Sequence, residues 1–284
     1  MDTTNDCSRR RRRRLARLRH HLQGAPPPRQ VLVGAAAELE PDALLEINVL
    51  EPGLVVIRNF LTGDQQRRLA DEATQWGSEG ESGFYTALEG AGEPQLNADD
   101  GRGRIYDAAE RFPDEFIAHS ARASALAAVD PHMPKMECSH VLINMYQAES
   151  GLVWHRDIYE NDGQSDHPVV NLSVGVSCVF GIRCPSGLER HLLLRSGDVL
   201  LFGGPCRFAE HAVLEVRLDD RPSWMPRRDE AKRFSFTFRD SPEVRGREEE
   251  FKYFKPDVHL VGQESFEENA PALLPALPTQ KAAL

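Results

Sequence analysis

Short apolar runs separated by turns recur along the chain from residue 50 onward. Within a run, apolar residues either alternate with polar ones or follow one another, as they do in half-buried or fully buried strands. These runs cover residues 54–57, 141–143, 169–180, 192–194, 199–202, 208–216 and 233–239. From residue 141 onward they are joined by turns with no helices between them. This pattern predicts a sandwich or jelly roll and not a parallel α/β sheet.

Two stretches have the residue spacing of amphipathic helices. Thr62 is followed three residues later by Gln65, as in a capping box, and the apolar residues beyond predict a helix that ends at Gly77. Pro113 opens a second stretch with an apolar side, and Pro131 stops it. We therefore expect a mainly β fold with flanking helices, of the α+β class.

Composition indicates one folded domain, over residues 50–242. Residues 243–284 are charged and then rich in Ala and Pro, so we expect a weakly ordered segment there. Within the domain, residues 78–106 are rich in Gly, Asp and Glu, and a long irregular stretch of this kind is typically a functional loop. Its Phe84 and Tyr85 either stack on a ligand or pin the loop to the core.

Charge is distributed unevenly along the chain. Residues 1–30 hold nine Arg and two Asp, a net charge of +7, whereas the whole chain carries −10, so the remainder carries −17. Residues 9–14 are all Arg. Self-repulsion and the lack of a buriable face predict a disordered basic arm. Such an arm suits nucleic-acid contact, nuclear import or organelle targeting, and a solvated tail without a role is the alternative.

Cysteine content and hydropathy indicate the cellular compartment in which the protein works. The five Cys are odd in number and include no Cys-x-x-Cys pair, which argues against a disulfide framework and against a structural zinc site. No apolar run is long enough to span a membrane. We expect an intracellular protein without membrane contact, in the nucleus or cytoplasm, with an organelle as the alternative. The sequence does not fix the oligomeric state, and a monomer is our expectation.

Candidate metal ligands lie in two strand-like segments. His155 and Asp157 are two residues apart, so on a strand both side chains point to one face and can hold one ion. One imidazole and one carboxylate are two thirds of the facial triad that binds non-haem Fe(II), and His211 lies in a later strand-like run. A chance His-x-Asp in a surface turn is the alternative reading.

The last predicted strand has one polar and one aromatic face. Arg233 and Arg239 share a face with Ser235, while three Phe occupy the other face. Two guanidinium groups on one face can bind the carboxylates of a di-acid, because each fork matches a carboxylate with two hydrogen bonds. The strand therefore either lines a cavity or faces solvent with its Arg side.

Taken in order, these groups resemble the motifs of the AlkB family of Fe(II)/2-oxoglutarate dioxygenases. The resemblance rests on Asn144-x-Tyr146, His155-x-Asp157, His211, and the pair Arg233 and Arg239. It implies a double-stranded β-helix, with His155, Asp157 and His211 as iron ligands. It also implies that 2-oxoglutarate is held by Asn144, Tyr146, Arg233, Ser235 and Arg239. Because the family uses dioxygen to remove alkyl groups from bases, we expect a demethylase of N-alkylated bases in DNA or RNA.

Two positions depart from the family pattern. Family members often have Asn where Ser235 stands, and a shorter hydrogen-bonding group there should still allow cosubstrate binding. Bacterial members have an Asp that reads the damaged base where Tyr159 stands, so the identity of the base is open. We expect Tyr159, Phe84 and Tyr85 to contact the substrate.

Two other functions remain open. The first is the same iron chemistry on a protein side chain or a small molecule, which Tyr159 permits. The second is a non-catalytic nucleic-acid binder that uses its basic arm. The complete set of ligand residues argues against the second, and fold alone decides neither.

Overall fold

The computed structural model describes eight segments of the chain. They are residues 31–33, 44–78, 83–86, 95–96, 102–147, 150–157, 166–225 and 231–240. The basic arm, the C-terminal segment and Tyr159 lie outside these residues, so the interpretations made for them stay predictions. Within the described residues, no helix is both long and apolar enough to cross a membrane.

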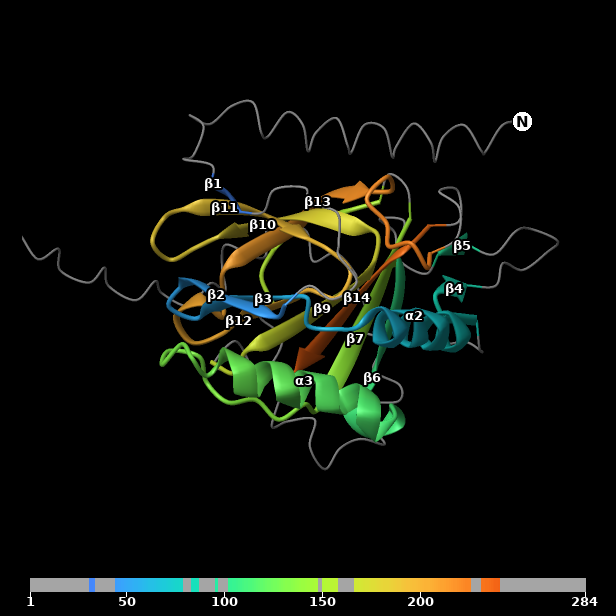
Figure 1. Ribbon diagram of the computed structural model, residues 1–284, viewed down its shortest axis with the longest axis horizontal. Helices are drawn as coiled ribbons and strands as arrows, with labels where there is room; N and C mark the ends of the chain where they lie inside the picture. Colours follow the sequence, from blue (N-terminus) through green and yellow to red (C-terminus); the bar gives the residue numbers. More distant parts are fainter. Residues whose placement is uncertain are drawn as a thin grey trace, which may run out of the picture.

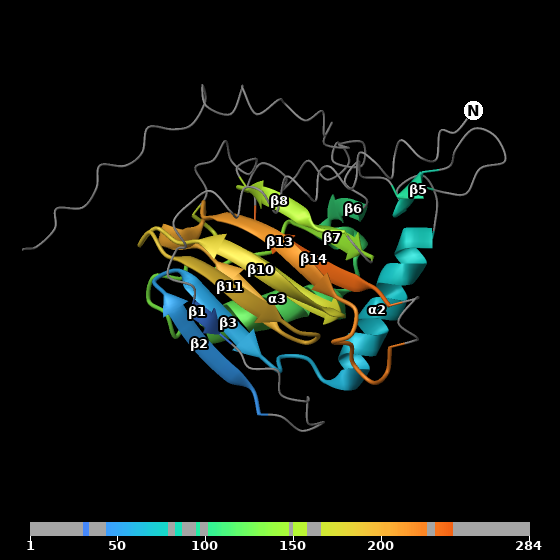
Figure 2. The same cartoon turned by 90° about the horizontal axis from the view of Figure 1, so that it is seen from above.

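The smaller of the two main sheets has five strands in the order β1-β11-β10-β13-β8, and Figure 2 shows them side by side. β1 joins β11 in parallel, and the other neighbours are antiparallel. The strands are β1 (Val31–Val33), β11 (Glu189–Leu194), β10 (Ser177–Arg183), β13 (Glu210–Arg217) and β8 (Leu152–His155). β8 lies at the edge of this sheet.

The larger sheet has seven antiparallel strands in the order β2-β3-β12-β9-β14-β7-β6. Its strands are β2 (Glu46–Glu51), β3 (Leu54–Arg58), β12 (Val199–Phe202), β9 (Val169–Gly175), β14 (Arg233–Arg239), β7 (His140–Tyr146) and β6 (Gly103–Ala108). A separate short hairpin pairs β4 (Tyr85–Thr86) with β5 (Gln95–Leu96).

Two helices cover the outer face of the larger sheet, so the molecule has three layers (Figure 1). They are α2 (Gly63–Ser78) and α3 (Asp114–Ala127), and the short turns η1 (Ala109–Arg111) and η3 (Gly204–Cys206) precede α3 and β13. One apolar cluster fills the space between the helices and the larger sheet, and a second lies between the two sheets. A mainly β fold with flanking helices is therefore confirmed.

Strand β14 is an inner strand of the larger sheet, and all seven of its residues are buried. Its Phe residues face the helices, where Phe116 of α3 lies 5.3 Å from Phe236 and 5.2 Å from Phe238, between ring centroids. Its other face, with Arg233, is turned towards the second sheet, because successive side chains on a strand alternate. The predicted division into an aromatic and a polar face is confirmed, and the polar face does not meet solvent.

The predicted capping box opens α2. The backbone N–H of Thr62 donates to Oε1 of Gln65 at 3.0 Å, and the N–H of Gln65 donates to Oγ1 of Thr62 at 3.3 Å. The helix ends one residue beyond the predicted Gly77. Trp76 packs edge-on against Phe112 and Phe116, with centroid distances of 5.0 and 5.3 Å, so it stabilises the attachment of the helix to the core.

Two boundaries that the sequence predicted are wrong. The domain begins before residue 50, because β2 starts at Glu46. The stretch 78–106 is not irregular throughout, because β6 begins at Gly103 and pairs with β7 as an edge strand. Residues 101–104 alternate Gly and Arg, which is not the apolar pattern of a strand. The strand is stabilised by pairing with β7 and not by its own apolar residues.

The predicted strand over residues 169–180 is two strands in different sheets. Gly175 has a φ of +93°, which turns the chain out of β9 before β10 begins. A Cβ atom at this position would overlap the carbonyl oxygen of Lys232. That carbonyl accepts a 3.0 Å hydrogen bond from the N–H of Val176. Continuous hydrophobicity hid the break because both strands are buried.

We expect Gly175→Ala to destabilise the fold by about 3 kcal/mol, because left-handed strain and a backbone overlap act together. Gly187→Ala is the matched control. Gly187 has a φ of +82°, but nothing lies within 4 Å of a Cβ built there, so strain alone should cost about 1 kcal/mol. Urea unfolding of both variants measures the difference, and equal losses would show that the Lys232 contact relaxes freely.

Candidate metal and cosubstrate site

Three predicted metal ligands meet between the sheets. His155 ends β8 and lies directly opposite His211 in the pairing with β13, and Asp157 follows two residues later. One ligand atom from each of the three lies within 4.8 Å of the others. The Nε2 atoms of His155 and His211 are 3.7 and 3.8 Å from the two carboxylate oxygens of Asp157. A pairing register thus brings together residues that are far apart in sequence.

Both imidazoles have the tautomer that a metal ligand needs. Nδ1 of His155 lies 2.9 Å from the carbonyl oxygen of Val153, and Nδ1 of His211 lies 3.0 Å from that of Ala209. A carbonyl oxygen only accepts hydrogen bonds, so each Nδ1 carries the proton and each Nε2 keeps its lone pair. Removal from water lowers the pKa of both His residues, which keeps the rings neutral.

The site is closed on one side and open on the other. The ring of His211 lies between Phe180 and Phe202, at centroid distances of 5.6 and 4.9 Å, and 7% of its side chain is exposed. The side chain of His155 is 30% exposed. The site is therefore more exposed on the His155 side, next to the edge strand β8.

Two Arg residues hold Asp157. Nη2 of Arg239 lies 2.8 Å from its Oδ2, and Nη1 of Arg207 donates to its backbone carbonyl at 2.7 Å. Arg207 is 2% exposed and stands four residues before His211, so it connects the segments that carry two of the ligands. Sequence reasoning missed Arg207. In the sequence it is one Arg shortly after the turn Gly203-Gly204-Pro205, and it belongs to no periodic pattern that would indicate a role.

The predicted cosubstrate residues lie on neighbouring strands near these ligands. In the pairing of β7 with β14, Tyr146 is opposite Arg233 and Asn144 is opposite Ser235. Tyr146 and Arg233 are each 1% exposed. Because cross-strand partners share a face, all four side chains project between the sheets. The structure therefore brings together the residues that the AlkB resemblance singled out.

Arg233 fits a carboxylate ligand. Its Nη2 donates to Oγ of Ser173 at 3.0 Å. Its buried Nε and Nη1 have no hydrogen-bond partner among the described residues. A buried guanidinium with unused N–H groups is costly, and a carboxylate can satisfy two of them at once. The other candidates have protein partners: Oγ of Ser235 lies 2.9 Å from Nδ2 of Asn171, and Arg239 contacts Asp157. Their contact with a cosubstrate stays a prediction.

The predicted substrate contacts are corrected in part. Phe84 is 1% exposed and packs in the core, 6.1 Å from Phe234 between ring centroids. Atoms of its ring lie where a Cβ on Gly77 or Gly103 would be, so two glycines make room for it. Phe84 thus pins the chain to the core, and its assignment to the substrate was wrong. Tyr85 is half-buried and packs against the same cluster.

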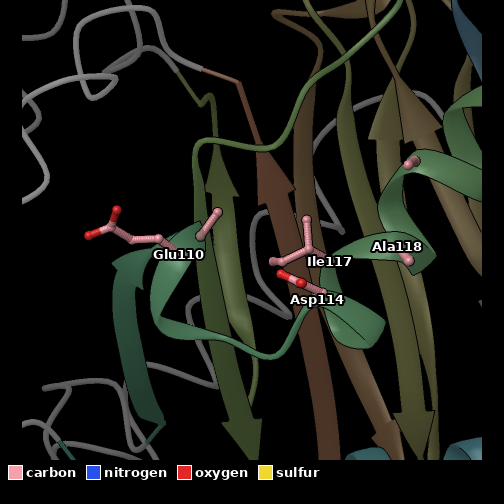
Figure 3. A pocket seen from close by; sticks show the side chains of 6 residues that line it. Glu110, Asp114, Ile117 and Ala118 are labelled. Carbon is pink, nitrogen blue, oxygen red and sulfur yellow. The ribbon is translucent and has the colours of Figure 1, made fainter.

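A shallow depression on the outer surface is separate from this site. It has a volume of about 350 Å³, and Figure 3 shows Ile117 and Asp114 of α3 in it, with Glu110 pointing away from the helix. It is lined by Ala109, Glu110, Asp114, Ile117, Ala118 and Ala121. It lies on the helix side of the larger sheet, whereas the candidate ligands lie between the sheets, and none of its lining residues is a His, Arg or Tyr.

Comparison with known proteins agrees with this set of residues. The sequence pattern of the 2OG-Fe(II) oxygenase superfamily matches residues 53–239, more than half of the chain. The chain belongs to this superfamily. The match includes all three candidate metal ligands and the strand that carries Arg233. Superfamily membership implies Fe(II) and 2-oxoglutarate as cofactors, as the sequence predicted.

Relatives of AlkB type are found within the superfamily. The DNA N(6)-methyladenine demethylase ALKBH1C of Arabidopsis thaliana is 30% identical over 205 residues, which cover 61% of this chain and 45% of that protein. The alpha-ketoglutarate-dependent dioxygenase AlkB of Salmonella typhimurium is 30% identical over 130 residues, covering 45% of this chain and 55% of that protein. The chain thus spans about half the length of the curated relatives it matches. The predicted AlkB resemblance is confirmed.

The solved structure of OsALKBH1 has the same fold as this superfamily member. Its TM-score is 0.57 at 22% identity, and the match covers 69% of this chain and 100% of that one. The two facing sheets described above, antiparallel except where β1 pairs with β11, are the double-stranded β-helix that the AlkB resemblance predicted. That part of the prediction is also confirmed.

Proposed function

We propose that the protein is an Fe(II)/2-oxoglutarate-dependent dioxygenase that demethylates N-alkylated bases in DNA or RNA. The observation that carries this proposal is the cluster of His155, Asp157 and His211, with both Nε2 lone pairs free to bind a metal. The relatives that act on nucleic acid support the choice of substrate. Membership of the superfamily supports the use of dioxygen.

The residues present suit these cofactors. Two imidazoles and one carboxylate are the ligand set that holds non-haem Fe(II) and leaves positions for other ligands. When bound, iron with 2-oxoglutarate and dioxygen supplies the oxidising chemistry that removes an alkyl group from nitrogen. Arg239 and Arg207 hold Asp157, one of the three ligands, in place. Arg233 offers buried N–H groups to a cosubstrate carboxylate, and Phe180 and Phe202 keep water from the His211 side.

An assay on defined oligomers tests the proposal. The protein is reconstituted with Fe(II) without oxygen, then given 2-oxoglutarate, air and short DNA or RNA oligomers that each carry one methylated base. We expect loss of methyl from at least one oligomer, with formaldehyde and succinate formed in equal amounts. His211→Ala is the control and should form neither product. Succinate without loss of methyl from any oligomer would favour a protein side chain or a small molecule as substrate.

Four further interpretations stay predictions. Tyr159 lies outside the described residues, so its contact with the base has no structural test. A monomer and an intracellular location rest on the sequence alone. The role of the basic arm in binding nucleic acid also rests on its charge of +7 against −17 for the rest of the chain.

A further inference from the structure

Arg102 contacts one of the predicted cosubstrate residues, although no sequence motif includes it. It stands immediately before β6, where Gly103 pairs with Met145 and Arg104 pairs with Asn144. Position 102 is thus a diagonal neighbour of Asn144, within reach of a long side chain. Its Nη1 donates to Oδ1 of Asn144 at 3.0 Å. Arg102 is 8% exposed and Asn144 is 4% exposed, so the contact is shielded from water.

This contact decides which way the Asn144 amide faces. An Asn side chain has an acceptor, Oδ1, and a donor, Nδ2, and rotation of the amide by half a turn exchanges them. A guanidinium has only N–H donors. If the amide turned over, two donors would face each other in a buried site, which is unfavourable. Arg102 therefore holds Oδ1 towards itself and leaves the N–H groups of Nδ2 as the donors that Asn144 can offer elsewhere.

We propose that Arg102 is a positioning residue that orients the Asn144 amide to donate to a carboxylate of 2-oxoglutarate. A carboxylate only accepts hydrogen bonds, so an amide that presented Oδ1 would repel it. This inference rests on the proposed function, because it needs 2-oxoglutarate as the ligand. Arg102 would affect 2-oxoglutarate binding only by orienting Asn144, whereas Arg233 offers its own N–H groups to the ligand.

A double-mutant cycle tests the proposal, with 2-oxoglutarate binding measured by calorimetry on protein loaded with Mn(II) in place of iron. Arg102→Met removes the donors and keeps a long side chain. It should weaken 2-oxoglutarate binding by roughly ten- to a hundredfold, the usual effect of removing a residue that orients a ligand-binding group. Asn144→Ala should have a similar effect. The double variant should bind no more weakly than Asn144→Ala alone, because Arg102 then has nothing to orient.

Two further variants separate orientation from charge and from folding. Arg102→Lys keeps a donor and should retain most of the affinity. Arg111→Met removes a nearby charge that pairs with Asp107 at the surface, and should change affinity by less than about threefold. If Arg102→Met does not fold, Asn144→Asp replaces it. A carboxylate at that position keeps the contact with Arg102 but has no donor, so 2-oxoglutarate binding should fall by more than in Asn144→Ala.

The outcomes separate this inference from the proposed function. The positioning role would be overturned if the losses of 2-oxoglutarate affinity in the two single variants multiplied in the double variant. Unchanged binding in Arg102→Met would also overturn it. Demethylation without such coupling would leave the proposed function intact and remove only the role of Arg102. Coupled binding of 2-oxoglutarate without activity on any oligomer would uphold Arg102 and overturn the nucleic-acid substrate. A wild-type protein that does not bind 2-oxoglutarate would overturn both.

Discussion

Asp157→Asn is expected to abolish turnover and to weaken metal binding by at least about a hundredfold. The amide keeps the shape of the side chain and can still accept a hydrogen bond from Arg239. It removes the negative charge that offsets the charge of a divalent ion, and leaves two neutral imidazoles. Mn(II) or Co(II) affinity measured by calorimetry, together with succinate formation, tests this expectation.

Asp157→Ala should in addition destabilise the metal-free protein by about 3 kcal/mol, because the buried Arg239 loses its carboxylate partner. Asp166→Ala is the matched control, since Asp166 is an exposed carboxylate near the site in sequence. It should leave both metal affinity and stability unchanged. Wild-type metal affinity in Asp157→Asn would show that the His pair binds the ion without this carboxylate.

Arg233→Lys is expected to raise the 2-oxoglutarate concentration for half-maximal rate by about thirty- to a hundredfold. Lys replaces a planar fork with a point charge, and two charge-assisted hydrogen bonds cannot form in the same geometry. The rate at saturating 2-oxoglutarate should stay within about threefold of wild type, because the lost interaction binds the cosubstrate equally well before and during the reaction. Steady-state succinate formation across a range of 2-oxoglutarate concentrations measures both values.

Arg239→Lys provides the contrast. Since Arg239 contacts Asp157 at 2.8 Å, its replacement should weaken metal binding more than it weakens 2-oxoglutarate binding. If Arg239→Lys and Arg233→Lys show the same loss of 2-oxoglutarate affinity with metal affinity intact, Arg239 binds the cosubstrate directly. If neither variant loses it, 2-oxoglutarate is held elsewhere.

Local patterns predicted the parts of the fold that depend on neighbours in sequence. The alternation along Arg233-Phe234-Ser235-Phe236 is a property of any strand, and the Thr62 and Gln65 capping box is complete within four residues. His155 and Asp157 share a face for the same reason. What made them a site was His211, and its position depends on the register between β8 and β13.

Residues that depend on contacts between distant segments could not be predicted. No sequence motif includes Arg207 or Arg102. Arg207 donates to Asp157 and Arg102 donates to Asn144, and each acceptor lies more than forty residues away in the sequence. Gly175 breaks an apolar run because of the Lys232 carbonyl, which no local pattern contains. For Phe84 the sequence predicted a substrate contact that the structure does not have. Its ring packs in the core because two glycines from other elements leave space for it.

Strand β14 has no position that faces solvent, since one side holds the helices and the other holds the candidate site. A substitution there that repacks the Phe side also moves the Arg side, because both are carried by the same seven residues. Libraries made to alter substrate choice should therefore leave β14 constant. Apart from the metal ligand His155, the partly exposed positions of β6 and β8 lie on edge strands and are freer to vary. Diversity placed on those edge strands can change what enters while the metal and cosubstrate groups stay in place.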